Sequence, residues 1–166
     1  MKRPIIGLAC LSAVTAGVLA LAGCGGSGAG ERLSKAEYQQ QGAAIGARLK
    51  KEFKDIDTAD PANVKEVAPL MDRLGEALDT LANEFDKLNP PADVAEAQNR
   101  FVAAARATAN EARAIGDRIQ KEPLAELSKN GDQLDISQSK NFAELQRAMN
   151  EIKAKGYEFG DTLGGG

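Results

Sequence analysis

Cys24 is the residue whose type and surroundings point most directly to chemistry. The chain contains two cysteines, Cys10 and Cys24, and no histidine. Without histidine, no Ser–His or Cys–His pair can activate a nucleophile. The usual histidine ligand of haem iron and the Glu-x-x-His pairs of di-iron bundles are excluded for the same reason. The sequence therefore predicts no catalytic residue, no metal ligand and no cofactor, and leaves Cys24 as the candidate for covalent modification.

The residues that precede Cys24 have the composition of an export signal. Lys2 and Arg3 give a positively charged start, and residues 5–21 are mostly apolar and uncharged. Small residues then lead to a cleavage point, as in exported and processed chains. The alternative is an uncleaved membrane helix, because the apolar stretch is long enough for a marginal span. Either interpretation places the rest of the chain outside the cytoplasm.

The sequence Leu21-Ala22-Gly23-Cys24 resembles the lipobox of bacterial lipoproteins. The resemblance implies cleavage between Gly23 and Cys24, and a diacylglyceryl thioether with acyl chains such as palmitate on the Cys24 sulfur. Acyl chains contribute about 0.8 kcal/mol per buried CH2, so more than one chain holds a domain on a bilayer. With Cys24 lipidated and the signal peptide removed, neither an internal disulfide nor a zinc site of His and Cys is expected.

Residues 24–33, which begin with the lipidated cysteine, are expected to form a flexible tether. Residues 25–30 are Gly, Ser and Ala only, with a reach of roughly 15 Å. Gly25, rather than Asp, follows the cysteine. By analogy with lipoprotein sorting, this implies no retention at an inner membrane. The expected location is the extracytoplasmic face of the cell membrane, or the outer membrane in a cell with two membranes.

The charge balance argues against nucleic acid as a partner. The formal net charge is -3, from 21 basic and 24 acidic side chains. Removal of the two basic residues of the signal peptide leaves 19 against 24, or -5. Nucleic-acid binding needs a basic stripe. A small basic cluster, at positions 48, 50, 51 and 54, is better explained by the dipole at a helix C-terminus. The alternative for this cluster is a contact with anionic headgroups or an acidic partner.

A run of acids raises the possibility of a calcium site. Asp55, Asp57 and Asp60 are followed by Glu66 at the twelfth position counted from Asp55. The EF-hand pattern, however, needs Gly at the sixth position and an oxygen ligand at the fifth, where this chain has Asp60 and Ala59. A polar loop between helices explains the run better, so no metal site is predicted.

The first helix is predicted from a capping box. Ser34 can cap the helix, and Glu37 stands three residues later to complete the box. Gly42 and Gly46 form a small-x-x-x-small pair on the same helix. In a polar helix this pair predicts a close crossing with a neighbouring helix.

The second helix has the clearest periodicity. Its apolar residues alternate four and three positions apart, at Val67, Met71, Leu74, Leu78, Leu81, Phe85 and Leu88. This seam is typical of coiled coils and antiparallel bundles. Asp60 and Pro61 are expected to start the region, as the cap and the first helical residue. Pro69 predicts either a kink or a short turn before a helix that begins near Ala68.

Two further helices follow the break at Pro90 and Pro91. They are expected over residues 92–120 and 137–155, with a short helical piece near residues 123–131 and Gly156 as the final stop. Three acid–base pairs four residues apart support the helical register: Glu96 with Arg100, Asp117 with Lys121, and Glu151 with Lys155.

The sequence therefore predicts an all-α fold, an antiparallel up-down helical bundle of about four helices over residues 34–156. Short connections favour antiparallel neighbours. The bundle follows a cleaved signal peptide (residues 1–23) and the tether. Residues 157–166 are expected to form a flexible C-terminal tail, in which Tyr157 and Phe159 can fold back over the bundle end.

The body of the chain also resembles a known group. Residues 33–38 (LSKAEY), the leucine-spaced second helix and residues 88–91 (LNPP) resemble a loose group of small helical bacterial lipoproteins. The resemblance covers most of the mature chain. The group has no assigned biochemical role, so the resemblance implies a fold and an address rather than an activity.

Three functions compete at this point. The leading hypothesis is a non-enzymatic, membrane-anchored lipoprotein that presents a helical surface to an envelope protein, as an interaction or scaffold module. The alternative is a carrier for a lipid or a small apolar ligand, which needs a cavity of a few hundred Å³. An enzyme is the least favoured, because the many acids on these helices form no motif, although carboxylate pairs of the glycosidase type stay open.

Overall fold

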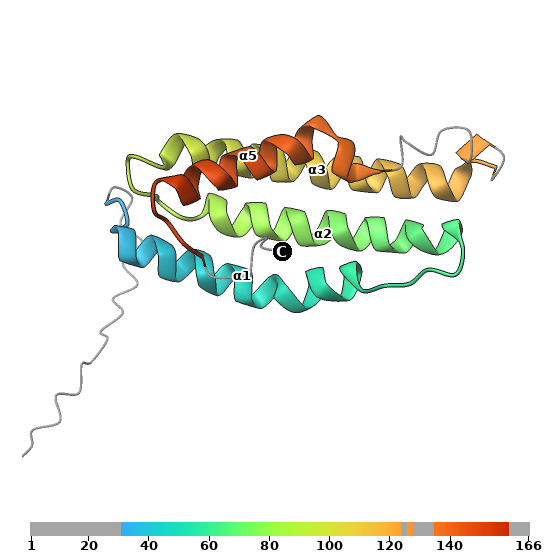
Figure 1. The fold of residues 1–166 in the computed structure, drawn as a ribbon, viewed down its shortest axis with the longest axis horizontal. Coiled ribbons are helices and arrows are strands. Elements are labelled where there is room, and N and C mark those ends of the chain that lie inside the picture. The colour runs from blue at the N-terminus through green and yellow to red at the C-terminus, as the bar shows by residue number, and fades with distance from the viewer. Residues whose placement is uncertain (1–30, 124–125, 128–134, 160–166) are drawn as a thin grey trace, which may run out of the picture.

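The computed structural model describes residues 31–123, 126–127 and 135–159. In these residues there is no strand, and the long α-helices are α1 (Lys35–Asp57), α2 (Val67–Asp86), α3 (Ala95–Lys121) and α5 (Lys140–Ala154). Successive long helices run in opposite directions along a common axis (Figure 1). The predicted all-α, antiparallel up-down bundle is confirmed. The signal peptide, Cys24, residues 25–30 and the segment around Asn130 and Gly131 lie outside the described residues.

Helix α1 begins as its sequence predicts. The Ser34 side chain accepts a hydrogen bond from the Glu37 amide at 3.3 Å, and a Glu37 carboxylate oxygen accepts one from the Ser34 amide at 2.9 Å. This reciprocal pair is the predicted capping box, and it satisfies two amides that a helix start otherwise leaves without partners. The hydrogen bonds from Ser34 also lower the pKa of the Glu37 carboxyl.

Helix α2 begins at Val67, later than the start at Asp60 and Pro61 that the sequence predicted. Asn63 provides the cap instead, because its side chain accepts from the Lys65 amide at 3.0 Å and starts a 3-10 turn, η1 (Val64–Glu66). Of the two alternatives for Pro69, the short turn before a new helix is the one observed. Pro69 lies in the first turn of α2, where its missing amide would have had no helical partner.

The start of α5 also differs from its predicted position. Asp135 accepts hydrogen bonds from the amide and hydroxyl of Ser137, and this holds Ser137 in the 3-10 turn η3 (Ile136–Gln138). The helix cap is therefore Ser139, whose side chain accepts from the Phe142 amide at 3.0 Å. Gly156 ends the helix as predicted, with a φ of 79° that favours glycine.

The interface between α2 and α3 is the most extensive in the bundle, followed by that between α3 and α5 and then that between α1 and α2. Two glycines let α2 and α3 approach closely. A β-carbon on Gly75 would lie 3.0 Å from the Ala109 carbonyl oxygen, and one on Gly116 would lie 3.1 Å from the Ala68 carbonyl oxygen. Buried alanines line the rest of α3, so α2 and α3 form the rigid part of the fold.

The packed part of the chain extends past the predicted end of the bundle. Tyr157 and Phe159, expected in a flexible tail, are 3% and 1% exposed and belong to the main apolar core. We call residues 157–159 the C-terminal strap, because they pass from the end of α5 to α1 (Figure 1). The expectation that the two rings fold back on the bundle is confirmed, but they pack inside it and do not cover its end.

The close neighbour of Gly42 is the C-terminal strap, so the predicted helix crossing is wrong. A β-carbon on Gly42 would lie 2.5 Å from Cε1 of Phe159, which no real contact allows. Gly46, one turn later, is also buried. Gly42 of α1 therefore admits an aromatic ring from the C-terminal strap at a point where a side chain would clash with it.

The last residues of the predicted tether are fixed to the bundle. The Leu33 amide donates to the Asn89 carbonyl at 2.8 Å, the Asn89 side chain donates to the Glu31 carbonyl at 2.8 Å, and Arg32 donates to the Pro90 carbonyl at 3.0 Å. We call these three hydrogen bonds the tether clamp. They fix the start of α1 to the connection between α2 and α3.

Candidate functional site

The residues predicted to carry the chemistry, Leu21, Ala22, Gly23 and Cys24, lie outside the described residues. Their lipidation therefore stays a prediction. The site that the structure does provide is a hollow on the surface between α1 and α2, which the sequence gave no direct sign of.

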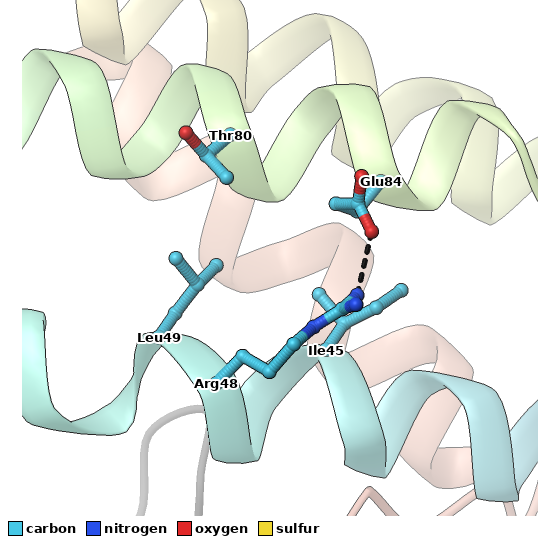
Figure 2. Close-up of a pocket in the computed structure, with 5 residues that line it drawn as sticks. All are labelled: Ile45, Arg48, Leu49, Thr80 and Glu84. Atoms are coloured by element: carbon cyan, nitrogen blue, oxygen red, sulfur yellow. Dashed lines mark hydrogen bonds and ion pairs between the residues drawn. The ribbon is translucent and has the colours of Figure 1, made fainter.

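The hollow has a volume of about 260 Å³ and is lined by five residues, Ile45, Arg48, Leu49, Thr80 and Glu84. The first three come from consecutive turns of α1, and the last two lie one turn apart on α2 (Figure 2). Ile45 and Leu49 are buried apolar side chains, with 3% and 7% exposure. The hollow therefore combines an apolar base with a polar rim.

An ion pair closes one side of the hollow. Arg48 Nη2 lies 2.5 Å from Glu84 Oε2 (Figure 2). Lys87 Nζ lies 2.6 Å from Glu84 Oε1. The hydrogen bond from Lys87 contributes most to lowering the pKa of the Glu84 carboxyl, with smaller contributions from the charges of Lys87 and Arg48. Glu84 therefore stays ionised at neutral pH and has no proton to donate as a general acid.

The hydroxyl in the hollow is engaged as well. Thr80 Oγ1 donates to the Glu76 carbonyl of its own helix at 2.9 Å. The carboxylate in the lining, Glu84, is held by Arg48 and Lys87, and the Thr80 hydroxyl donates to the Glu76 carbonyl and not to Glu84. What the hollow can do is accept an apolar group against Ile45 and Leu49, with an Arg–Glu pair beside it to orient a polar neighbour.

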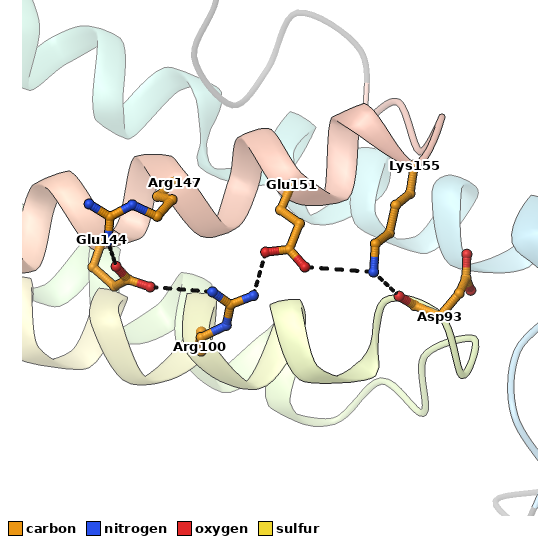
Figure 3. A network of polar contacts seen from close by, with 6 residues as sticks. All are labelled: Asp93, Arg100, Glu144, Arg147, Glu151 and Lys155. Carbon is orange, nitrogen blue, oxygen red and sulfur yellow. Dashed lines mark hydrogen bonds and ion pairs between the residues drawn. The ribbon is translucent and has the colours of Figure 1, made fainter.

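A second polar feature joins α3 to α5. Arg100 on α3 lies between two acids of α5, bonded to Glu151 and 3.7 Å from Glu144 (Figure 3). Arg147 pairs with Glu144, and Lys155 lies 3.6 Å from Glu151. The network continues from Lys155 to the backbone carbonyl of Asp93.

This α3–α5 network corrects one predicted pair and confirms another. Arg100 was expected to pair with Glu96 on its own helix, but its guanidinium reaches across to α5. The predicted Glu151–Lys155 pair is present. The hydrogen bond from Arg100 is the largest cause of the lowered pKa of the Glu151 carboxyl, and the same bond raises the pKa of Arg100. Stably ionised partners of this kind fix the register of α5 on α3 rather than transfer protons.

The basic cluster of α1 is partly neutralised. Arg48 pairs with Glu84, and Lys51 Nζ lies 2.6 Å from Asp55. The hydrogen bond from Lys51 is the main cause of the lowered pKa of Asp55. One carboxylate of the acidic run is therefore engaged by a lysine. Within the described residues, no group of three or more His, Cys, Asp or Glu side chains is placed to hold a metal ion.

Three comparisons with known proteins gave no match. No family model matches the sequence, no curated protein matches it, and no solved structure matches the fold. In the part of the chain that the structure describes, no helix has both the length and the apolar character needed to cross a membrane.

Proposed function

We propose that this protein is a lipid-anchored, extracytoplasmic interaction module of the cell envelope without enzymatic activity. The sequence Leu21-Ala22-Gly23-Cys24 supports the anchor, through its resemblance to a lipobox. The observation that carries the interaction is the hollow between α1 and α2, an apolar base beside an ion pair at the surface of the bundle.

The size of the hollow favours a partner side chain over a free ligand. Pockets for small molecules and cofactors usually have volumes of about 300–1,000 Å³. The hollow, at about 260 Å³, is smaller than this range. One or two apolar side chains of a partner helix would fit against Ile45 and Leu49, in the manner of a helix that docks in a groove. A carrier of lipid or another apolar ligand is the less supported alternative.

The position of the hollow suits a protein held at one end. The tether clamp fixes the end of the tether to the connection between α2 and α3, at the start of α1. The hollow begins at Ile45, roughly 15 Å further along this helix. A tether of residues 24–30 adds roughly 15 Å of reach. The hollow would then stand clear of the headgroups and face a partner laterally.

Two measurements test the proposal. In the first, labelled palmitate should enter the full-length chain and the chain should fractionate with membranes, whereas Cys24→Ser should lose both properties. A wild-type chain that carries no lipid would contradict the anchor.

In the second, a photo-crosslinking amino acid at Thr80 should capture a specific envelope protein in cells. The same group at Asn99, which is exposed on α3, serves as the matched control. Equal capture from both positions, or no capture from Thr80, would reject the hollow as the contact surface.

A further inference from the structure

One face of α1 is already a binding surface for an extended peptide. The C-terminal strap has no regular secondary structure, and it contacts α1 at Lys35, Tyr38, Gln39 and Gly42. Counted from Lys35, these positions are i, i+3, i+4 and i+7, and they therefore share one face of the helix. We call this face the α1 seat.

Two aromatic rings of the C-terminal strap fill the α1 seat. The Phe159 ring meets Tyr38 edge to face, with centroids 5.4 Å apart, and reaches Phe85 of α2 at 5.6 Å. The Tyr157 ring meets Tyr38 at 5.6 Å. Edge-to-face contacts of this kind stabilise aromatic pairs beyond the area that they bury. The α1 seat therefore holds two aromatic side chains that are two residues apart in the sequence.

Polar contacts fix the direction of the peptide. Tyr157 Oη donates to Asp93 Oδ1 at 2.8 Å, and the Lys35 ammonium lies 4.8 Å from the centre of the Tyr157 ring. Gln39 donates to the carbonyl of Glu158 at 3.5 Å, and the Glu158 side chain is exposed. The segment bound in the α1 seat thus has an aromatic residue, then a residue whose side chain is exposed, and then a second aromatic residue.

The C-terminal strap packs on helices that are distant from it in the sequence. Its connection to the last helix passes through Gly156, and its rings lie on α1 and α2, far away in sequence. Helix α1 is also held by the tether clamp and by its interface with α2, which is less extensive than the α2–α3 and α3–α5 interfaces and contains the hollow. An occupied α1 seat therefore adds to a limited attachment of α1.

We propose that the α1 seat is a peptide-binding site that the C-terminal strap holds closed in cis. Its partner is an extended segment of another envelope protein, with a Tyr-x-Phe pattern like that of the strap. This inference rests on the proposed function, because it names a surface and a partner chemistry for the interaction module. Binding in trans replaces the strap, so the strap acts as an autoinhibitory contact.

The test uses the full chain with Phe159→Ala and a synthetic peptide of residues 153–159 (KAKGYEF). The peptide should bind the variant saturably and shift the amide NMR signals of Tyr38 and Gly42. Wild type should bind at least about tenfold more weakly, because the tethered strap competes at high effective concentration. A peptide with alanine in place of the final Phe should not bind.

A second variant keeps the result interpretable. Phe159→Leu leaves a smaller apolar side chain, and it replaces Phe159→Ala if circular dichroism shows that helicity has been lost. Adding Gly42→Ala to either variant should abolish peptide binding. A folded variant that fails to bind the peptide would overturn the proposal. Peptide binding that survives Gly42→Ala would also overturn it. So would a variant that associates with a second copy of itself in place of the peptide.

The experiments can reject the proposed function and the α1 seat independently of each other. Capture of a protein from Thr80 together with no peptide binding would retain the interaction module and reject the α1 seat. Peptide binding together with an unlipidated Cys24 would retain the α1 seat and reject the membrane anchor.

Discussion

The ring of Phe159 occupies the space that a β-carbon on Gly42 would need. Such a carbon would lie 2.5 Å from Cε1 of the ring, and the ring itself is 1% exposed and cannot move aside freely. A residue near the start of the bundle and one after its last helix therefore determine each other. Glycine is required at position 42 because of the C-terminal strap, against its low helix propensity.

Gly42→Ala should destabilise the protein by about 2 kcal/mol. Alanine in place of glycine normally stabilises a helix by about 0.5–1 kcal/mol, but here the added methyl group must displace a buried ring, and overpacking costs about 1–3 kcal/mol. Urea unfolding measures the change. Gln40→Ala, at an exposed position of the same helix, should stay within about 0.5 kcal/mol of wild type. A stabilised Gly42→Ala variant would mean that the ring does not lie there.

Gln98→Ala should cost about 1–3 kcal/mol. The Gln98 side chain is 3% exposed and donates to the carbonyls of Phe85 at 3.0 Å and Leu88 at 3.2 Å, near the end of α2. Its removal takes the side-chain donor from the Leu88 carbonyl and one donor from the Phe85 carbonyl, which also accepts from the Leu88 amide. The lost hydrogen bonds and the space left by a buried side chain together have about this cost. Gln120→Ala, exposed on the same helix, is the control for urea unfolding. Equal midpoints for the two variants would contradict this role.

Arg100→Gln should reduce the loss of stability in acid. The pKa of Glu151 is lowered in the folded state, so its contribution is present above the unfolded value of about 4.3 and is lost as the pH falls below it. Without Arg100 the folded and unfolded values approach each other. Melting temperatures at about pH 7 and pH 3 should therefore differ less in the variant than in wild type. Arg147→Gln, a more exposed arginine of the same network, should keep most of the wild-type difference.

Alkaline titration should report the opening of the α1 seat. Burial is the main reason that the pKa of Tyr157 is raised to about 12, and burial also raises the pKa of Tyr38. A raised pKa contributes stability that is intact below the unfolded value of about 10 and is lost as the pH rises toward 12. The chain has two tyrosines and no tryptophan, so tyrosinate absorbance observes these rings alone.

In that titration the absorbance should rise together with unfolding, above pH 10. Ionisation at the ordinary value in a folded chain would contradict the burial of the two rings. Phe159→Ala, which empties part of the α1 seat, should shift the absorbance midpoint toward the ordinary value.

The sequence predicted those features of the fold that depend on neighbours in the chain. The capping box of Ser34 and Glu37, the α2 seam and the stop at Gly156 all act within one or two turns, and all are present. Helix starts were less accurate where two caps competed. Asn63 provides the cap in place of Asp60, and the last helix begins at Lys140 rather than near Ser137, because each start depends on hydrogen bonds in a preceding turn.

The candidate sites were harder to predict, because they depend on contacts between distant elements. Arg100 has an acid four residues before it, yet it pairs with acids on α5, and no local rule distinguishes these outcomes. The hollow is formed by side chains of both α1 and α2, and the seam pattern within one helix does not show it. Gly42 was a usable signal for a close neighbour, but the sequence did not indicate that the neighbour would be Phe159.

The tether clamp has a mechanical consequence if Cys24 is anchored. A pull on the tether would reach the hydrogen bonds of Leu33, Asn89 and Arg32 before it reached the first turn of α1. The load would then pass into the connection between α2 and α3, the most extensively packed pair of helices. Forces from the membrane would thus be carried by the rigid half of the bundle, and α1 would be spared from peeling away from its first turn.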